Sequence, residues 1–273
     1  MLTFFSLRDQ KRFSASVPLL VGLALVSGCS TSEMGRHQMM LVPESRVERL
    51  SGKTFERIKF RNKIDNNPEE NQYVQCIVSA LSETIPDHPK WEVALFLSDQ
   101  ANAFALPGGK IGIYTGIFRV AINADQLATV IGHEIGHVIA QHGRERMSQQ
   151  MTVNGLELTS NILARNASDR GAAGLASGAS AIGQFGILYP FSRQQETEAD
   201  LIGLRIMVQA GFDPKESVKF WKNMETYGIG ETDEELTSHP PSRERIENLT
   251  LFMTQIAGHN GYAGKSMHCV TPE

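Results

Sequence analysis

Two histidines and a glutamate lie close together near the middle of the chain. His133, Glu134 and His137 form an H-E-x-x-H pattern inside a segment whose apolar residues have helical spacing. Residues four apart on a helix project from the same face, so the two imidazoles can bind one metal ion. Glu134 can then reach a water molecule beside that metal. The pattern predicts zinc-dependent hydrolysis with Glu134 as the general base.

A catalytic zinc takes three protein ligands, so the third must come from elsewhere in the chain. Glu196 is the best candidate, because it opens a second helical segment with the sequence E-T-E-A-D. Asp200 lies one turn further on, where it can accept a hydrogen bond from a ligand histidine and fix its tautomer. We therefore expect one zinc ion per chain, bound by His133, His137 and Glu196.

The H-E-x-x-H pattern is short and also occurs by chance. Its alternative interpretation is a surface helix that happens to carry two histidines and a glutamate. Burying these three polar residues without a metal or partners would be costly. The residues around them indicate that this helix is buried, because they are small or apolar: Ile131, Gly132, Ile135, Gly136 and Val138. This setting favours the metal site.

The elements that must position these residues follow from the apolar spacing and the turn signals. We expect helices over residues 71–85, 123–147, 194–210, 213–227 and 240–256, and strands over residues 91–97, 101–106 and 110–115. Pro107, Gly108 and Gly109 predict a turn that pairs the last two strands. The predicted fold class is α+β, a mainly helical zincin-like metallopeptidase domain with a small antiparallel sheet.

Residues 148–189 lie between the two ligand-bearing segments and are rich in Gly, Ala, Ser and Asn. Small side chains of this kind fit either tightly packed helix pairs or a loop, and the sequence does not choose between them. The segment is a candidate lid over the cleft. It is equally a candidate docking surface for a partner or a membrane.

The N-terminus has the features of an export signal. Basic residues precede an apolar run at residues 17–26, which is too short to cross a bilayer comfortably. The stretch L-V-S-G-C at residues 25–29 resembles the bacterial lipobox, whose cysteine is lipidated. An ordinary signal peptide that ends near a cysteine is the alternative. We expect lipidation of Cys29, and Ser30 after it favours the outer membrane by resemblance to known lipoprotein sorting.

The composition is that of an ordinary globular protein. The chain has 273 residues, of which 41% are hydrophobic and 21% charged, and its formal net charge is −4. No run of Lys or Arg suggests a nucleic-acid surface, so we expect no nucleic-acid partner. Cys76 and Cys269 are candidates for a disulfide, because an exported chain meets an oxidising compartment. Two unrelated free thiols are the alternative.

Four motifs in order resemble the signatures of gluzincin endopeptidases related to CAAX-prenyl proteases, of the HtpX, BepA and LoiP type. They are N-A-F-A-L-P-G-G at residues 102–109, the H-E-x-x-H helix, S-R-x-x-E-x-E-A-D at residues 192–200, and S-H-P-P-S at residues 238–242. The similarity runs over residues 71–256. The HtpX type carries transmembrane helices that we do not find in this sequence, so the chain resembles the exported lipoprotein branch.

The resemblance implies roles for further residues. It supports the ligands and the base given above, and it implies that Asp200 orients a ligand histidine, His133. It implies that Arg193 is a structural or active-site arginine. His239 is implied to lie near the metal, where it stabilises the transition state or plugs the open zinc position. A helix-start residue before two prolines is the alternative role for His239.

These inferences divide the chain into four parts. They are a lipoprotein signal peptide (1–28), a tether and an irregular or weakly helical lead-in (29–70), a zinc metallopeptidase domain (71–258) and a C-terminal tail (259–273).

The expected substrate site is the strand that contains Asn102, Ala103 and Phe104. An extended peptide could pair with this edge through backbone hydrogen bonds, which tolerate many sequences. An ordinary core hairpin is the alternative. We expect an endopeptidase that cleaves unfolded or misassembled cell-envelope proteins from a lipid anchor on the periplasmic side. The competing hypothesis is a latent, plugged zinc protein that acts as a chaperone-like factor in outer-membrane protein assembly.

Overall fold

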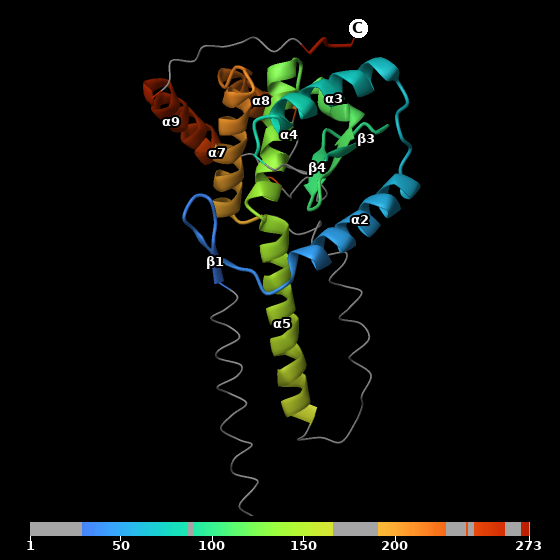
Figure 1. Cartoon of the computed structure of the whole chain (residues 1–273), viewed down its shortest axis with the longest axis vertical. Helices are drawn as coiled ribbons and strands as arrows, with labels where there is room; N and C mark the ends of the chain where they lie inside the picture. The colour runs from blue at the N-terminus through green and yellow to red at the C-terminus, as the bar shows by residue number, and fades with distance from the viewer. Residues whose placement is uncertain are drawn as a thin grey trace, which may run out of the picture.

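The computed structural model describes residues 29–86, 90–165, 191–227, 239, 243–259 and 269–272. The expected signal peptide lies outside these ranges, and so does the part of the candidate lid that follows residue 165. The expected α+β class is confirmed: helices form most of the body, and a small sheet lies on one side (Figure 1).

The bounds of the elements follow the chain order. The helices are α2 (Glu44–Arg61), α3 (Pro68–Ser82), α4 (Ala124–Ile139), α5 (His142–Arg165), α7 (Arg193–Gln209), α8 (Lys215–Thr226) and α9 (Arg243–His259), with a short 3-10 helix η1 (Thr115–Arg119). The strands are β1 (Cys29–Thr31), β2 (His37–Met39), β3 (Glu92–Phe96), β4 (Ala103–Leu106) and β5 (Lys110–Tyr114).

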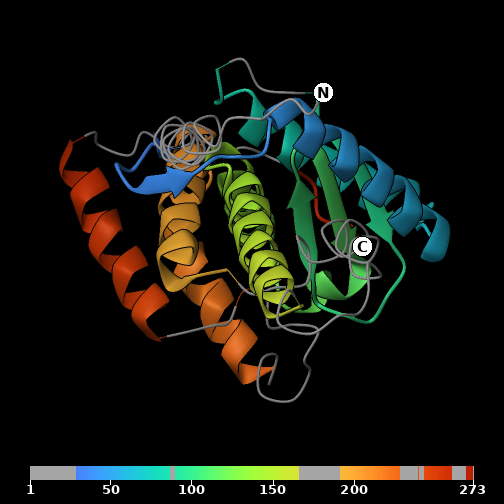
Figure 2. The ribbon, with the colours of Figure 1, turned by 90° about the horizontal axis from the view of Figure 1, so that it is seen from below.

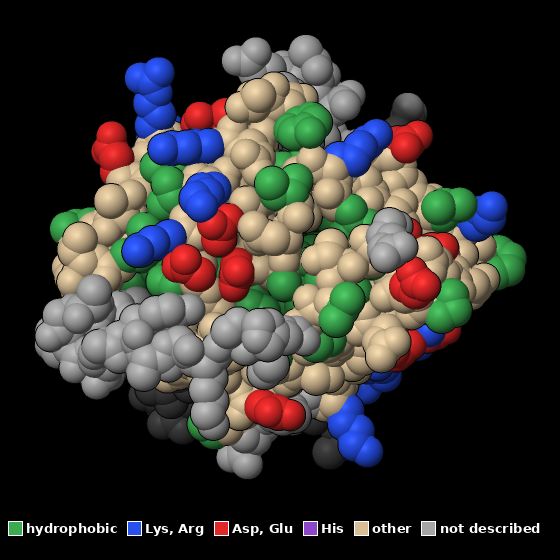
Figure 3. All heavy atoms as spheres, turned by 90° about the horizontal axis from the view of Figure 1, so that it is seen from above, with side chains coloured by type: hydrophobic (Ala, Val, Ile, Leu, Met, Phe, Trp, Pro, Cys, Tyr) green, Lys and Arg blue, Asp and Glu red, His purple; other side chains and the backbone are tan. Residues whose placement is uncertain are grey.

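The consecutive helices α4 and α5 form the centre of the molecule. Figure 2 shows them between α7 and α8 on one side and the sheet with α2 on the other. Leu127, Ile131 and Ile135 of α4 are fully buried in the main core. The helix that carries the H-E-x-x-H pattern is therefore packed on both sides, as its apolar surroundings predicted. On the face seen in Figure 3, basic, acidic and apolar side chains of the described residues are interspersed.

The three-stranded sheet has the order β3-β5-β4. β4 and β5 form the expected antiparallel hairpin, in which Ala103 lies opposite Ile113. β3 pairs with β5 in parallel, so the sheet is mixed rather than wholly antiparallel. The reason is that residues 97–102 carry the chain past β5 to its far side, which leaves β4 at the edge of this sheet.

A regular helix, α2, occupies much of the segment that we expected to be a tether with an irregular or weakly helical lead-in. α2 spans 18 residues and buries Val47, Ser51 and Phe55, which are four apart and so share one face. Pro43 stands at the N-cap position and does not break the helix. Phe55 packs edge-on against Phe104 of the sheet, with ring centroids 6.3 Å apart.

The expected helix over residues 123–147 is two helices. α4 ends at Ile139, and Gln141 then takes a positive φ of 55° before α5 begins. The side-chain amide of Gln38 in β2 donates a hydrogen bond to the carbonyl of Ala140 at 2.7 Å. The N-terminal hairpin of β1 and β2 thus holds the turn between the two helices.

The expected cysteine pair is joined. Cys76 of α3 and Cys269 form a disulfide with a Cα–Cα distance of 5.8 Å, which attaches residues 269–272 to the body of the protein. Within the described ranges, no helix combines the length and the apolar character needed to cross a membrane.

Candidate metal centre

Glycines allow α4 and α7 to approach until their backbones touch. A Cβ on Gly136 would lie 2.6 Å from the carbonyl oxygen of Ala199, and one on Gly203 would lie 2.7 Å from the carbonyl carbon of Gly132. Both distances are shorter than real side chains tolerate. The close approach brings short and medium side chains of the two helices to a common centre.

The three expected zinc ligands meet at this centre. The Nε2 atoms of His133 and His137 lie 3.0 Å apart. The carboxylate of Glu196 lies 3.4 Å from His133 Nε2 and 3.5 Å from His137 Nε2. Together with one atom of His239, these ligand atoms all lie within 4.8 Å of one another.

The donor set fits zinc. Nitrogen and oxygen ligands at the usual zinc distances stand roughly 3.3 Å apart around a tetrahedral ion. The Nδ1 atom of His133 lies 2.9 Å from Asp200 Oδ1, so its proton belongs on Nδ1 and its Nε2 presents a lone pair. The Nε2 atoms of His133 and His137, 3.0 Å apart, can share either a proton or a metal cation between them. Two imidazoles and a carboxylate are the protein ligands of one class of catalytic zinc site.

Asp200 occupies the orienting position that the sequence predicted, and an unpredicted arginine holds it there. Arg245 of α9 donates to Asp200 Oδ1 at 2.7 Å and to Oδ2 at 2.8 Å, and its Nη1 lies 3.0 Å from Glu196. Its guanidinium stacks 3.7 Å above the ring of Trp221. Burial raises the pKa of Asp200, but Arg245 and His133 outweigh burial and lower it.

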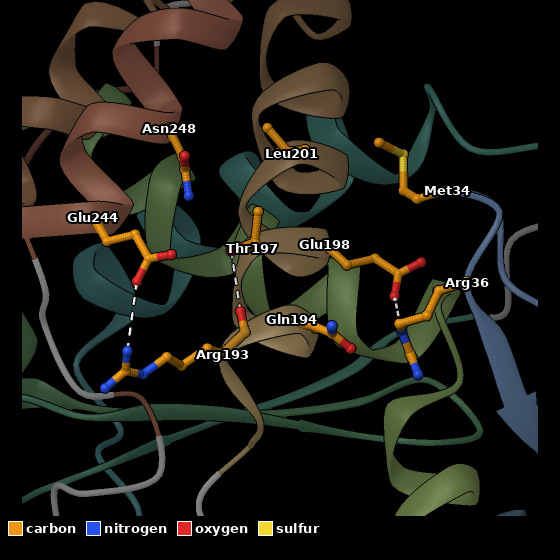
Figure 4. Close-up of a pocket in the computed structure, with 9 residues that line it drawn as sticks. All are labelled: Met34, Arg36, Arg193, Gln194, Thr197, Glu198, Leu201, Glu244 and Asn248. Carbon is orange, nitrogen blue, oxygen red and sulfur yellow. Dashed lines mark hydrogen bonds and ion pairs between the residues drawn. The ribbon is translucent and has the colours of Figure 1, made fainter.

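The structure does not bring Arg193 to the centre. Its side chain is 93% exposed, and its nearest ion-pair partner is Glu244 at 3.9 Å (Figure 4). Arg245 fills the expected structural role instead, because Asp200 and Glu196 are buried carboxylates that need a buried cation. The sequence signal that could have indicated Arg245 is its position just after the S-H-P-P-S motif, but this position does not show that Arg245, rather than Arg193, is buried.

The two histidines expected to bind zinc are electrostatically different. Burial and Arg245 lower the pKa of His133, but Asp200 and Glu196 outweigh them and raise it to about 9. Burial lowers the pKa of His137 well below 6.5. Burial raises the pKa of Glu196, but the surrounding histidines hold it well below its usual range. The centre thus retains an ionised carboxylate.

Glu134 lies between the ligands and the sheet. Its Oε2 accepts a hydrogen bond from the backbone amide of Ala105 in β4 at 3.1 Å. Beside it is a cavity of about 40 Å³, whose lining includes Asn102, Ala103 and His239. Two of the three expected substrate residues therefore face the cleft.

The third expected substrate residue has its side chain elsewhere. The ring of Phe104 packs in an aromatic cluster with Phe96, centroid to centroid 6.3 Å, and covers Gly112, where a Cβ would lie 2.3 Å from the ring. The side chain of Phe104 therefore belongs to the core and not to the lining of the cavity.

His239 lies inside the ligand cluster. Its Nδ1 is 2.9 Å from Glu196 Oε1 and 3.1 Å from His133 Nε2, and its Nε2 is 3.5 Å from Glu134 Oε1. The ring therefore stands between two of the ligands and the general base. Both implied roles, stabilising a transition state and plugging an open metal position, require this proximity.

These features are those of a metallopeptidase centre: ligands on two packed helices and a glutamate beside an edge strand. Residues 68–252 match the family model of peptidase family M48, and the chain belongs to this family. The family resemblance seen in the sequence is thereby confirmed, while the exported lipoprotein branch stays a prediction.

Three curated relatives illustrate the match. The chain is 35% identical over 207 residues to the mitochondrial metalloendopeptidase OMA1 of Saccharomyces cerevisiae. The matched region covers 67% of this chain and 54% of that protein. It is 33% identical over 204 residues to the beta-barrel assembly-enhancing protease of Yersinia pestis, with 71% and 41% covered. It is 27% identical over 235 residues to OMA1 of Homo sapiens, with 81% and 45% covered. The chain spans about half the length of the curated relatives it matches.

Proposed function

We propose that this chain is a zinc-dependent endopeptidase that hydrolyses internal peptide bonds of misfolded or misassembled cell-envelope proteins. One observation carries the proposal: the Glu134 carboxylate bonds the Ala105 amide of β4 at 3.1 Å and also adjoins the ligand cluster. A peptide paired with β4 would therefore run past a base and a metal centre at the same time.

The chain's own residues supply the acid–base steps. Zinc bound by the three ligands supplies Lewis acidity, which polarises the scissile carbonyl and lowers the pKa of water toward neutrality. Glu134 takes the proton of the attacking water and later delivers it to the leaving amine. Asp200 keeps the proton of His133 on Nδ1, 2.9 Å away. His239, once turned from the ligands, can donate a hydrogen bond to the developing oxyanion.

The edge of β4 supports unfolded polypeptides as the substrate class. The amide of Tyr114 donates to the carbonyl of Asn102 at 3.0 Å, so the backbone of Asn102 faces β5. In an antiparallel pair this orientation alternates, and the backbones of Ala103 and Ala105 therefore face away from the sheet. An extended segment can pair with that edge, whereas a compact folded protein does not offer one.

The cell envelope is proposed as the location. The basic and apolar N-terminus and the lipobox-like residues before Cys29 support export and a lipid anchor, with the outer membrane favoured. The relative from Yersinia pestis is named for β-barrel assembly, which agrees with an envelope role. The OMA1 relatives are named mitochondrial, so family membership alone does not set the compartment.

The position of His239 favours a second candidate, a latent zinc protein that acts mainly as a chaperone-like factor in outer-membrane protein assembly. A ring 2.9 Å from Glu196 and 3.1 Å from His133 would compete with water for a zinc ion bound there. Opening of the site would then control how often the chain cleaves.

Cleavage of casein and of a compact disulfide-bonded protein by the full-length chain separates these candidates. We expect casein to be cleaved and the folded protein to be spared, and His239→Ala to cleave casein faster if the ring is a plug. The exposed His37 of β2 gives the control, His37→Ala, which should behave like the wild type. Faster cleavage of the folded protein would reject the substrate class. Bound zinc without cleavage by any variant would favour the chaperone-like candidate.

A further inference from the structure

A fourth histidine contacts the expected zinc ligand His137 at Nδ1, the ring nitrogen that does not face the ligand cluster. His142 is fully buried, and its Nδ1 lies 2.9 Å from His137 Nδ1. Residues five apart in a continuous helix point in different directions. The contact exists because the backbone turns at Gln141, where φ is 55°, and directs His142 back toward α4.

The contact between the two rings fixes where their protons lie. If His137 binds zinc through Nε2, its Nδ1 carries the proton and donates it to a hydrogen bond. His142 Nδ1 must then accept that bond, which places the proton of neutral His142 on Nε2. The opposite arrangement, with the proton on His142 Nδ1, would make His137 Nδ1 the acceptor and put a proton on the nitrogen that faces the metal.

A carboxylate selects the first arrangement. His142 Nε2 lies 3.1 Å from Glu198 Oε2, and a carboxylate oxygen accepts but does not donate. The same oxygen accepts a hydrogen bond from Arg36 Nε at 2.9 Å, the ion pair visible in Figure 4. Arg36 Nη1 and Nη2 donate to the two oxygens of Glu145, each at 2.7 Å. One guanidinium thus orients the carboxylates of α7 and α5.

We propose that Arg36, Glu198 and His142 are positioning residues that hold His137 in the tautomer whose Nε2 can bind the metal. The proposal rests on the zinc function proposed above. It assigns to His142 the same role toward His137 that Asp200 has toward His133. His133 and His137 then have separate supports, Asp200 for the first and His142 for the second.

Arg36, Glu198 and His142 form a series of contacts that ends at His137. The member of this series farthest from His137, Arg36, lies in the N-terminal hairpin. Arg36 precedes β2 and falls outside residues 68–252, the part that matches the peptidase family. Its side chain is 21% exposed in a cavity of about 320 Å³, whereas those of Glu145 and Glu198 are 4% exposed. Metal binding in the catalytic domain therefore depends on a residue of the lead-in segment.

If Arg36 only attached the hairpin to α7, loss of another ion pair between the hairpin and α7 should have the same effect on zinc binding. The chain contains such a pair as a matched control. Arg205 of α7 bonds Glu33 in the same hairpin at 2.6 Å, with both side chains about half exposed, at 44% and 47%. This pair also attaches the hairpin to α7 but does not lead to His137. Arg205→Met therefore removes an anchor of the hairpin without touching the proposed series.

The test is zinc affinity, by competition with a chromogenic chelator, and the visible spectrum of the Co²⁺-substituted full-length chain. We expect Arg36→Met and Glu198→Gln to weaken zinc binding roughly tenfold and to change the cobalt spectrum. Arg205→Met should leave both unchanged. Glu198→Gln keeps the size of the side chain, so it answers the question even if Arg36→Met does not fold.

Two results would overturn the inference in distinguishable ways. Zinc affinity and cobalt spectra of Glu198→Gln and Arg36→Met equal to those of Arg205→Met would reject the positioning role alone. A wild-type chain that is folded but binds neither metal would reject the proposed function, and the inference with it.

Discussion

The α-carbon of Gly136 lies against the backbone of Ala199, so close that a Cβ on Gly136 would come within 2.6 Å of the Ala199 carbonyl oxygen. Gly136 directly precedes His137, a proposed zinc ligand, and Ala199 directly precedes Asp200. The distance between α4 and α7 at this contact therefore sets how far the ligands of one helix stand from those of the other.

Gly136→Ala should separate the two helices and weaken both folding and metal binding. Overpacking of a close contact typically costs about 1–3 kcal/mol. We expect a loss of this size in the free energy of unfolding in urea, together with weaker zinc binding by chelator competition. Gly52 of α2, which has open space around it, provides the control. Gly52→Ala should raise stability by about 0.5–1 kcal/mol; equal stability of both variants would refute the packing argument.

Arg245→Met should destabilise the protein strongly. It removes the buried partner of Asp200 and Glu196 and leaves their charges uncompensated, which costs about 3–5 kcal/mol. Arg245→Lys should not restore stability, because an ammonium cannot donate to both oxygens of Asp200 in the same plane. Thermal unfolding of the two variants measures the effect, with the exposed Arg243 of the same helix changed to Met as control. A Tm of Arg245→Met equal to that of the control would contradict this role.

Glu216 should make the free energy of unfolding depend on pH independently of any metal. It accepts hydrogen bonds from Asn123 at 3.1 Å and Gln126 at 2.8 Å at the start of α4. Burial raises its pKa, but Lys219 and these two amides outweigh burial and lower the pKa below 4.5. The unfolded chain therefore binds the proton more readily, so the stabilisation is present above pH 4.5 and is lost as the pH falls through the lower folded pKa.

The matching variant is Glu216→Gln, measured in chelator so that metal release does not contribute. We expect it to be less stable than the wild type by about 1–2 kcal/mol at neutral pH, and the difference to shrink in acid. Urea unfolding at a series of pH values from 7 to 3 gives this difference directly. A difference that stays constant over this range would show that the charge of Glu216 is not what matters.

The disulfide should contribute to stability. Cys76 and Cys269 are 193 residues apart in sequence, and closing a loop of this size typically contributes about 2–4 kcal/mol. We expect Cys76→Ala and the double variant with Cys269→Ala to lose similar amounts, because either change breaks the same bond. Unfolding with and without reductant provides the comparison. A wild-type protein whose stability is indifferent to reductant would contradict the bond's contribution.

Local signals in the sequence predicted much of the site. The spacing of His133 and His137 and of Glu196 and Asp200 places each pair on one helix face, because that relationship depends only on the helical period. The turn at Gly108 and Gly109, both with positive φ, likewise follows from local chemistry. These are the elements whose structure depends on neighbours a few residues away.

The rest depends on contacts distant in sequence. The break after α4 is held by Gln38, about a hundred residues upstream, so the helical pattern alone predicted one long helix. The parallel pairing of β3 follows from the path of the chain around β5, which periodicity does not encode. Arg245, rather than Arg193, meets the buried carboxylates because α9 packs on α7, and the motif spacing contains no information about that contact.

The central claim is that a zinc site on α4 and α7 works with Glu134 as its base. Zinc content and casein cleavage, measured together on the full-length wild type and Glu134→Gln, test it most directly. We predict about one zinc ion per chain in both proteins, because Glu134 is not a ligand, and a loss of cleavage of at least about a hundredfold in the variant. Folded wild-type protein without zinc, or a variant that cleaves as fast as the wild type, would contradict the account.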